Sequence, residues 1–153
     1  MNNELPYRKP LRIINYNYSD PGFYFVTLCV KKRPNIFGKI VDSNMLLNQF
    51  GEIVNTCWTE LPVHYTNCKL DSYVIMPDHF HGIIFIEYNQ NNTLASIIKG
   101  FKSFSSKQIN LLLDDGQKFQ WQKSFYDRVI RDEDELFQVR KYIEQNPLKW
   151  DIL

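Results

Sequence analysis

Two histidines separated by one residue carry the strongest chemical signal in this chain. His79 and His81 lie within the largely apolar run Ser72–Ile86, and the chain has three histidines in all. Side chains two apart on a β-strand point to the same face of a sheet, so the two imidazoles would project together. Together they can bind one divalent cation and leave its other positions to water and substrate. Two hydrogen-bonded polar groups beside a turn are the alternative interpretation of an isolated His-x-His.

A second pair of chemical interest lies near the C-terminus. Tyr142 and Asn146 are four residues apart in a predicted helix, and such residues face the same flank of the helix. A phenol can act as a nucleophile, but with a pKa near 10 only about 0.1% of it is ionised at pH 7, so it needs an activating partner. From spacing alone, a boundary aromatic and a helix-terminating amide remain the alternative.

Length and composition limit the class of protein. A chain of 153 residues with 44% hydrophobic residues is long enough for one hydrophobic core, so we expect one domain over 1–153 with its core at about 8–150. No apolar run approaches the ~18 residues that a bilayer requires, and no signal peptide is evident, so we expect a cytoplasmic protein without a membrane partner. Cys29, Cys57 and Cys68 form no C-x-x-C pair, which predicts reduced thiols rather than disulfides or zinc ligands.

The distribution of charge indicates a nucleic-acid partner. The net charge of the chain is only +1, but residues 89–131 hold seven lysines and arginines against three aspartates. This local excess suits a phosphate backbone, and an ordinary solvated surface is the alternative. The candidate phosphate contacts are Lys99, Lys102, Lys107 and Arg131. Exposed aromatic residues such as Tyr16, Tyr18 or Trp121 could stack on unpaired bases of single-stranded DNA, and packing in the core is the alternative role for each.

The hydrophobic pattern predicts an α+β fold. Strand-like runs cover 23–30, 69–76, 79–87 and part of 117–131, with a short hairpin at 37–47. Helical spacing runs from Leu46 to Pro62, from Leu94 through Phe104, and from Asp132 to Pro147. This order predicts a ferredoxin-like, four-stranded antiparallel sheet with two helices on one face, plus a C-terminal helix that carries Tyr142. RNA-recognition (RRM-like) modules share this architecture, and the other face of the sheet would be free for a ligand.

Particular residues define the expected helix ends and faces. Pro62 and Pro147 are predicted to end their helices, because proline disrupts a helix interior. Glu135, three residues after Asp132, predicts a capping-box-like start for the last helix. The apolar face of the middle helix is predicted to hold Leu94, Ile97, Ile98, Phe101 and Phe104, and that of the last helix Leu136, Val139 and Ile143.

These segments together resemble one family. Met76-Pro-Asp-His-Phe-His-Gly-Ile-Ile84 is similar to the His-hydrophobic-His (HUH) motif of the single-tyrosine, IS200-like transposases of small bacterial insertion sequences. Pro21–Thr27, Ser124–Arg131 and Tyr142–Pro147 resemble more particularly the REP-associated tyrosine transposases. The similarity extends from about residue 8 to residue 150, which is nearly the whole chain.

The resemblance implies a site and a reaction. His79 and His81 would bind a divalent cation, Mg²⁺ or Mn²⁺, and Tyr142 would be the nucleophile. Asn146 occupies the position where insertion-sequence members carry a glutamine that assists the metal, so it would be a third ligand on a shorter side chain. Tyr126 competes as nucleophile, but its strand-like segment lacks the Tyr-x-x-x-amide spacing. The expected activity is metal-dependent cleavage and strand transfer of single-stranded hairpin DNA through a 5′-phosphotyrosine, in DNA transposition.

Three other functions remain open at the level of the sequence. A non-catalytic single-stranded nucleic-acid-binding module would use the open face of an RRM-like sheet, although no RNP-like aromatic signature is present. A metal-dependent hydrolase would use water in place of Tyr142. A replication initiator or relaxase of the wider HUH group would be expected to carry a helicase domain, and these 153 residues predict none. The sequence leaves a monomer and a homodimer both open.

Overall fold

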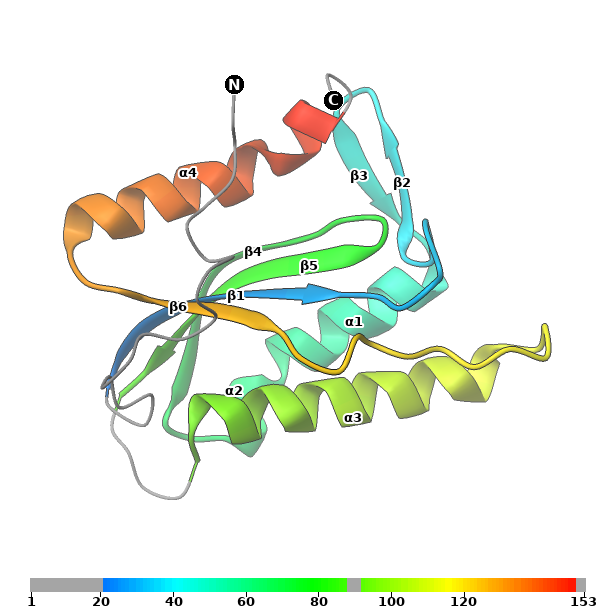
Figure 1. Ribbon diagram of the computed structural model, residues 1–153, viewed down its shortest axis with the longest axis horizontal. Helices are drawn as coiled ribbons and strands as arrows, with labels where there is room; N and C mark the ends of the chain where they lie inside the picture. The colour runs from blue at the N-terminus through cyan, green and yellow to red at the C-terminus, as the bar shows by residue number, and fades with distance from the viewer. Residues whose placement is uncertain (1–20, 88–91, 151–153) are drawn as a thin grey trace.

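The computed structural model describes residues 21–87 and 92–150. It consists of a twisted sheet with α4 on one side and the other helices on the opposite side (Figure 1). The strands are β1 (Gly22–Cys29), β2 (Gly38–Val41), β3 (Asn44–Leu47), β4 (Cys68–Ile75), β5 (His79–Ile86) and β6 (Tyr126–Ile130). The helices are α1 (Gln49–Thr59), α2 (Leu61–His64), α3 (Leu94–Leu112) and α4 (Glu133–Trp150).

The central sheet has the predicted ferredoxin-like topology. Its strand order is β4-β5-β1-β6, and each neighbouring pair is antiparallel. The α+β fold class is therefore confirmed, with β1, α1, β4, β5, α3 and β6 building the split βαβ unit. The predicted hairpin forms a separate two-stranded sheet, β2–β3. That residues 1–153 make up a single domain stays a prediction.

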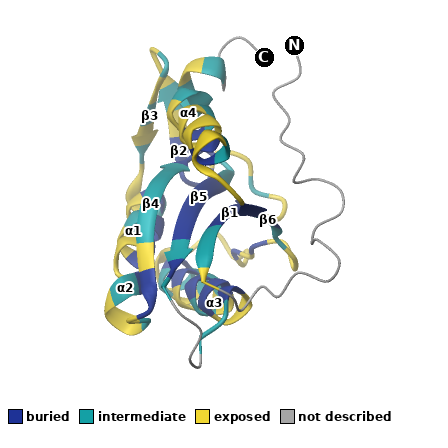
Figure 2. Ribbon diagram, turned by 90° about the vertical axis from the view of Figure 1, so that its left-hand side faces the viewer, coloured by how far each residue is buried: buried dark blue, intermediate teal, exposed yellow. Residues whose placement is uncertain are grey.

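The helices α1 and α3 pack against each other and cover one face of this sheet (Figure 2). Alternate residues of β1, among them Tyr24 and Leu28, belong to the large hydrophobic cluster on this side, as the two-residue period of a strand requires. At its centre, the ring of Trp58 lies 4.5 Å from that of Phe80 and 5.3 Å from that of Phe101. Each fully buried side chain of this size contributes roughly 1.5–3 kcal/mol, so this face holds most of the stabilising apolar burial.

The predicted apolar face of α3 is right for four residues and wrong for one. Leu94, Ile97, Ile98 and Phe101 are buried, but Phe104 is 46% exposed. Ser105 lies in the core instead, where its hydroxyl donates to the Phe101 carbonyl at 2.7 Å and accepts from the Trp121 indole at 3.0 Å. A small side chain that satisfies its hydroxyl locally can replace an apolar residue in a core, and hydrophobic periodicity does not identify such a residue.

The second face of the sheet is covered by α4, so the prediction of an open face is wrong along this helix. The apolar stripe of α4 is buried against residues of β1, β5 and β6 in a smaller cluster. This cluster consists of Phe25, Ile83, Ile130, Leu136, Val139 and Ile143, with Tyr142 packed beside it. The stripe was predicted from the sequence, but the surface that receives it comes from three strands distant along the chain.

Helix α1 begins and ends differently from the prediction. Leu47 belongs to β3, and Asn48 caps α1 by accepting hydrogen bonds from the backbone N–H groups of Phe50 and Gly51. Helix α1 ends at Thr59, and Pro62 does not end it, because Pro62 lies in the first turn of the next helix, α2. Proline is well tolerated there, because the N–H that it lacks has no partner in the first turn of a helix.

The start of α4 agrees with the prediction and its end does not. The Asp132 carboxylate accepts from the Glu135 backbone N–H at 2.8 Å, so the polar start is present. Pro147, however, lies inside the helix, which continues to Trp150. In a helix interior, proline removes the hydrogen bond to the carbonyl four residues earlier, so the last turn of α4 continues without the bond to the Ile143 carbonyl. Among the described residues, no helix is long and apolar enough to span a membrane.

Candidate active site

The two histidines lie on the face of the sheet that α4 covers. In the antiparallel register, His79 pairs with Cys29 and His81 with Thr27, all on alternate positions of β5 and β1. The imidazole rings have centroids 4.9 Å apart and are nearly perpendicular, at 78°. The expectation that both rings share one face is therefore met by the geometry of β5.

His81 is held in a buried, neutral state. It is 3% exposed, its ring stacks on that of Phe25 at 5.6 Å, and its Nδ1 shares a hydrogen bond with the Thr27 hydroxyl at 2.8 Å. Burial, and then the neighbouring His79, lowers the pKa of His81 well below its ordinary value. Neutral imidazole is the form that binds metal, and a hydrogen bond at Nδ1 orients the ring so that Nε2 is the ligating nitrogen.

His79 is oriented by its neighbour in sequence. Its Nδ1 lies 2.9 Å from a carboxylate oxygen of Asp78, and this hydrogen bond lowers the pKa of the Asp78 carboxyl. A carboxylate behind an imidazole fixes the ring and raises its basicity as a ligand. Asp78 and Thr27 were not identified from the sequence as site residues. Thr27 gave one available signal, as a polar residue inside an otherwise apolar strand run, and Asp78 directly precedes His79 in the sequence.

Tyr142 reaches the histidine pair from the opposite side, on α4. Its ring centroid lies 5.4 Å from that of His81 and 6.2 Å from that of Phe25, edge-on in both cases. The side chain is half-buried beside the α4 stripe, so packing of the helix onto the sheet places the phenol. The structure therefore brings together residues separated by about sixty positions in sequence.

The rival tyrosine lies on the same face of the sheet. Tyr126 begins β6 and pairs with Thr27 in the β1–β6 register, so it stands across β1 from His81. Directly paired residues of antiparallel strands project to one side. The predicted strand location of Tyr126 is confirmed, but this location alone does not separate it from the site.

Asn146 is turned toward its own helix. Its amide nitrogen donates to the Tyr142 carbonyl at 2.9 Å, and the side chain is half-buried. Within residues 21–87 and 92–150, no group of three or more His, Cys, Asp or Glu side chains could hold a metal ion. A role for Asn146 as a third metal ligand stays a prediction.

The candidate phosphate contacts do not gather at the histidines. Lys99, Lys102 and Lys107 lie on α3, on the opposite side of the sheet, and Arg131 follows β6 with an exposed side chain. Lys102 already has partners, because its Nζ donates to the carbonyls of residues 122, 123 and 124 at 2.8, 3.1 and 3.4 Å. Lys99 and Lys107 are exposed. Direct phosphate contact by these residues stays a prediction.

The structure tests only one of the three aromatic residues considered for stacking on bases. Trp121 is 7% exposed and packed between Phe37 and Phe101, so its role is the alternative one, packing in the core, and it offers no exposed stacking platform. Tyr16 and Tyr18 lie outside the described residues. Cys57 and Cys68 lie in the large cluster away from the site, where burial raises the pKa of Cys57 to about 11 and that of Cys68 to about 12, so both stay protonated at neutral pH.

Residues 23–146 match the family described as "Transposase IS200 like". The chain belongs to this transposase family. The match spans the sheet, the histidine pair and Tyr142. In sequence, the chain is 32% identical over 169 aligned positions to an uncharacterized protein of Haemophilus influenzae, covering 95% of this chain and 91% of that protein. It is 24% identical over 140 positions to a protein of the same species named as a REP-associated tyrosine transposase, covering 87% and 74% respectively.

Solved structures show the same fold. A REP-associated tyrosine transposase bound to a REP hairpin aligns with a TM-score of 0.69 at 16% identity, over 91% of this chain and 74% of that one. A transposase from Deinococcus radiodurans aligns with a TM-score of 0.54 at 16% identity, over 88% of this chain and 96% of that one. At this identity the likeness concerns the fold, which agrees with the family assignment.

Proposed function

We propose that this IS200-like transposase cleaves and rejoins single-stranded DNA at hairpin ends, with Tyr142 as the nucleophile and His79 and His81 as metal ligands. One observation carries the proposal, namely the meeting of three rings from two distant segments. The histidine ring centroids lie 4.9 Å apart, and the Tyr142 ring lies 5.4 Å from that of His81. Membership of a transposase family supports the same class of reaction.

The donors around these rings fit a weakly bound divalent cation. The two imidazoles offer nitrogen ligands, and Asn146 offers an amide oxygen. Mg²⁺ and Mn²⁺ prefer oxygen ligands, so phosphate oxygens and water would have to complete the coordination. When bound, the cation would neutralise negative charge on the scissile phosphate. We therefore expect tight metal binding only in the presence of DNA.

The proposed cleavage is a substitution at phosphorus. The Tyr142 phenol loses its proton to solvent and its oxygen bonds to phosphorus, while the bond between phosphorus and the 3′ oxygen breaks. The leaving 3′ oxygen takes up a proton, which gives a free 3′-hydroxyl. The strand that carries the 5′ phosphate stays attached to the tyrosine. Because this link keeps the energy of the phosphodiester bond, a second 3′-hydroxyl can reverse the step and join strands without ATP. The edge contact with Phe25 helps to hold the phenol in place.

The proposed substrate follows from charge and from the structural neighbour. That neighbour is bound to a REP hairpin, and this chain shares its fold. The exposed bases Lys99, Lys107 and Arg131, with Lys102, are the proposed phosphate contacts. Hairpin DNA carrying a single-stranded segment is therefore the proposed partner. Either a monomer or a homodimer would be compatible with a site built from one chain.

The test is a cleavage assay on a labelled DNA hairpin with Mg²⁺ or Mn²⁺, resolved on a denaturing gel. The wild-type protein should cut the strand and form a DNA-linked protein band, and excess chelator should abolish both. Tyr142→Phe removes one oxygen and keeps the ring, so it should bind DNA without cutting. Tyr126→Phe is the matched control and should still cut. Asn146→Ala should cut about 10–100-fold more slowly if the amide assists the metal or the phenol.

The same assay separates the rival functions. A hydrolase that uses water would keep cutting in Tyr142→Phe and would form no protein-linked DNA. A pure binding module would never cut, and the docking of α4 on the second sheet face weighs against an RRM-like use of that face. Full cleavage in excess chelator would exclude the metal from the mechanism.

A further inference from the structure

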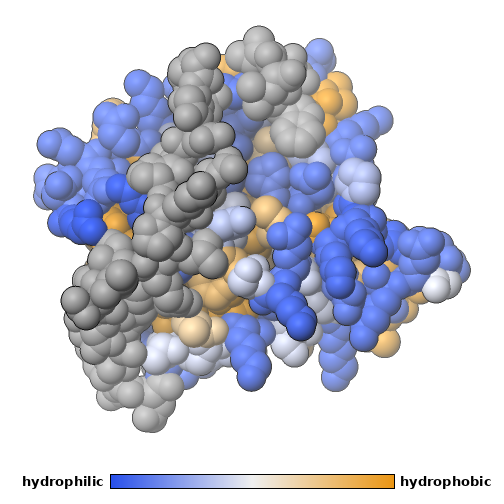
Figure 3. All heavy atoms as spheres, viewed as in Figure 1, coloured by the Kyte–Doolittle hydropathy of each residue, from blue (hydrophilic) through white to orange (hydrophobic). Residues whose placement is uncertain are grey.

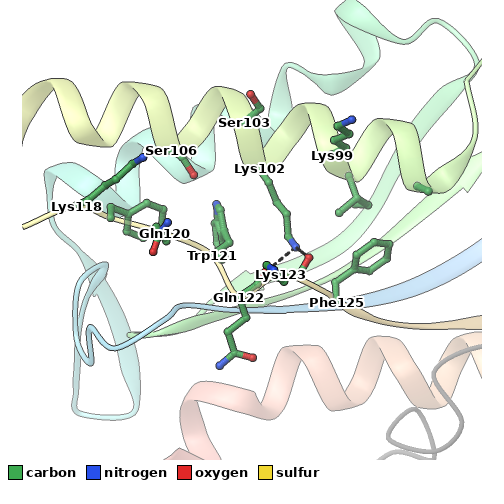
Figure 4. Close-up of a pocket in the computed structure, with 13 residues that line it drawn as sticks. Lys99, Lys102, Ser103, Ser106, Lys118, Gln120, Trp121, Gln122, Lys123 and Phe125 are labelled. Atoms are coloured by element: carbon green, nitrogen blue, oxygen red, sulfur yellow. Dashed lines mark hydrogen bonds between the residues drawn. The ribbon is translucent and has the colours of Figure 1, made fainter.

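A groove runs along α3 on the side of the sheet away from the histidines (Figure 4). It is bounded by α3 and by the extended segment 117–125 that leads into β6, and it encloses about 570 Å³. Its lining includes four lysines, Lys99, Lys102, Lys118 and Lys123, and no acidic side chain. The groove is therefore uniformly positive, and family membership does not assign it a function.

The wall opposite α3 is fixed in place. Asn110 of α3 binds the backbone of Phe119 twice, accepting from its N–H at 2.7 Å and donating to its carbonyl at 3.1 Å. Lys102 extends from α3 to the carbonyls of residues 122–124 and ties the other end of the wall (Figure 4). On its far side, the segment pairs with the end of β1 and the chain just after it, through Gln122 N–H to the Cys29 carbonyl at 2.8 Å and Lys31 N–H to the Gln120 carbonyl at 2.9 Å. Such a wall is organised before any ligand binds.

The groove presents the groups that single-stranded nucleic acid requires. Lys99, Lys118 and Lys123 are exposed and make no ion pair with other described residues, so they can bind phosphates. The half-buried ring of Phe125 lies at the end of the groove opposite Lys118, with Lys102 Nζ 5.6 Å from its centroid (Figure 4). Hydrophilic side chains cover this edge of the molecule in the space-filling view (Figure 3). A positive groove with an aromatic floor binds unpaired strands with little sequence preference.

The groove connects to the catalytic face through the end of β1. Gln122, in its wall, binds the backbone of Cys29, and Cys29 pairs with His79 in the β1–β5 register. After the groove, the chain enters β6, whose first residue, Tyr126, pairs with Thr27. A DNA strand that leaves the groove where β1 ends and β6 begins would reach the histidine pair and the phenol without crossing α4.

We propose that this groove binds the single-stranded flank of the DNA hairpin while the scissile phosphate lies at the histidine pair. This assignment rests on the proposed function and deepens it, because it separates the residues that bind the flank from those that do chemistry. Lys99, Lys118 and Lys123 contact the flank phosphates, and Lys102 shapes the wall. Spanning the thickness of the sheet edge requires several nucleotides, so a hairpin without a flank leaves the groove empty.

The experiment compares DNA hairpins by fluorescence anisotropy across a series of salt concentrations. One hairpin is blunt, and two others carry a twelve-nucleotide single-stranded tail, on the 5′ or the 3′ side. For the wild-type protein, one of the two tails, 5′ or 3′, should raise the affinity above that of the blunt hairpin. Lys99→Gln with Lys123→Gln should lower the affinity for that tailed hairpin roughly ten-fold at 0.1 M salt and make the salt slope shallower by about 1.4, as expected for two lost single-strand phosphate contacts.

A matched variant controls for net charge. Lys39→Gln with Lys69→Gln removes the same charge from β2 and from the far edge strand β4, and it should leave the tail effect unchanged. Equal loss in both double variants, or a tail that adds no affinity, would overturn the groove assignment. Cleavage of the tailed hairpin by the wild type and by the groove variant is measured in parallel at saturating protein concentration. If the groove variant binds tails as well as wild type while this cleavage persists, only the groove assignment fails; if no protein cleaves, the proposed function itself fails.

Discussion

The two faces of the central sheet are built for different purposes. The face under α1 and α3 is mainly apolar, and large side chains such as Trp58, Phe80 and Phe101 are fully or almost fully buried there. The face under α4 has, within the part of the chain that the structure describes, a cluster of six buried hydrophobic residues, and beside it lie the polar groups of Thr27 and His81. The first face provides stability, and the second gives up part of its apolar contact to position reactive groups.

Strand β5 displays this division residue by residue. Phe80 points into the large core and is flanked by His79 and His81, which point to the α4 face. The strand alternation that makes one face of β5 apolar therefore also sets both imidazoles on the other face. Mutations of neighbouring residues should consequently affect different properties: stability for one face and chemistry for the other.

After Tyr142→Phe, which should not cut at all, the largest expected effect on chemistry is at His79. His79→Ala should reduce hairpin cleavage at least about a thousand-fold, since a divalent cation bound there supplies several kcal/mol of charge stabilisation. Because the imidazole is half-buried at the end of β5, the circular dichroism spectrum and the urea midpoint should change little. Single-turnover cleavage and urea unfolding measure the two effects. Unfolding of this variant at low urea would show that His79 serves the core.

Phe80→Ala, one residue away, should have the opposite outcome. Removing this fully buried ring, which contacts Trp58 and Phe101, should lower the free energy of unfolding by about 3–5 kcal/mol. Cleavage per folded molecule should be much less affected than in His79→Ala. Urea unfolding gives the first quantity, and cleavage rates normalised to the folded fraction give the second. A destabilisation below about 1 kcal/mol would contradict the importance assigned to this face.

A smaller effect is expected at Thr27, which contacts His81 on the reactive face. Thr27→Val keeps the shape of the side chain and removes the hydroxyl that is 2.8 Å from His81 Nδ1. Loss of such a partner behind a ligand should weaken metal dependence or slow cleavage about 10–100-fold. Cleavage rates titrated with Mn²⁺ provide the measurement, and Thr27→Ser should restore most of the rate. An unchanged metal titration in Thr27→Val would remove Thr27 from the site.

The smallest effect concerns the attachment of α4. Arg140 on α4 makes a two-pronged ion pair with Asp71 of β4, at 2.8 and 2.7 Å, and this bond lowers the pKa of Asp71 from its ordinary value of 3.8. The stabilisation is present above the unfolded pKa and disappears as the pH falls through the lowered folded pKa. Arg140→Gln should therefore cost no more than about 1 kcal/mol at neutral pH, because the pair is partly exposed, with a smaller difference by about pH 3. Urea unfolding at both pH values measures it, and a cost that grows toward low pH would contradict the assignment.

Much of the fold follows from local patterns. The alternation within β1 and β5 and the helical spacing of α1, α3 and α4 predicted the order of elements, most of them to within a few residues. The errors in helix ends occurred at prolines, which were predicted to terminate helices. Pro62 was tolerated in a first turn, and Pro147 near a helix end, so neither proline ended its helix at the expected place.

Contacts between distant segments account for what the sequence did not predict. The spacing of Tyr142 and Asn146 indicated a reactive helix flank, but the docking of α4 on Phe25 and Ile83 depends on a surface assembled from separate strands. Lys102 was expected at a phosphate, whereas its Nζ binds carbonyls about twenty residues further along the chain. Such partners have no signature in a linear pattern, because the fold alone makes them neighbours.

The central claim is that Tyr142 becomes covalently linked to DNA. The direct measurement is to incubate the full chain with a DNA hairpin and Mn²⁺, denature and digest the product, and locate the nucleotide-modified peptide by tandem mass spectrometry. The account predicts a modification on Tyr142, attached to the 5′ phosphate of the cut strand and absent in excess chelator. A modification on Tyr126, which lies across β1 from His81 on the same face, would contradict it, as would cleavage that leaves no residue modified.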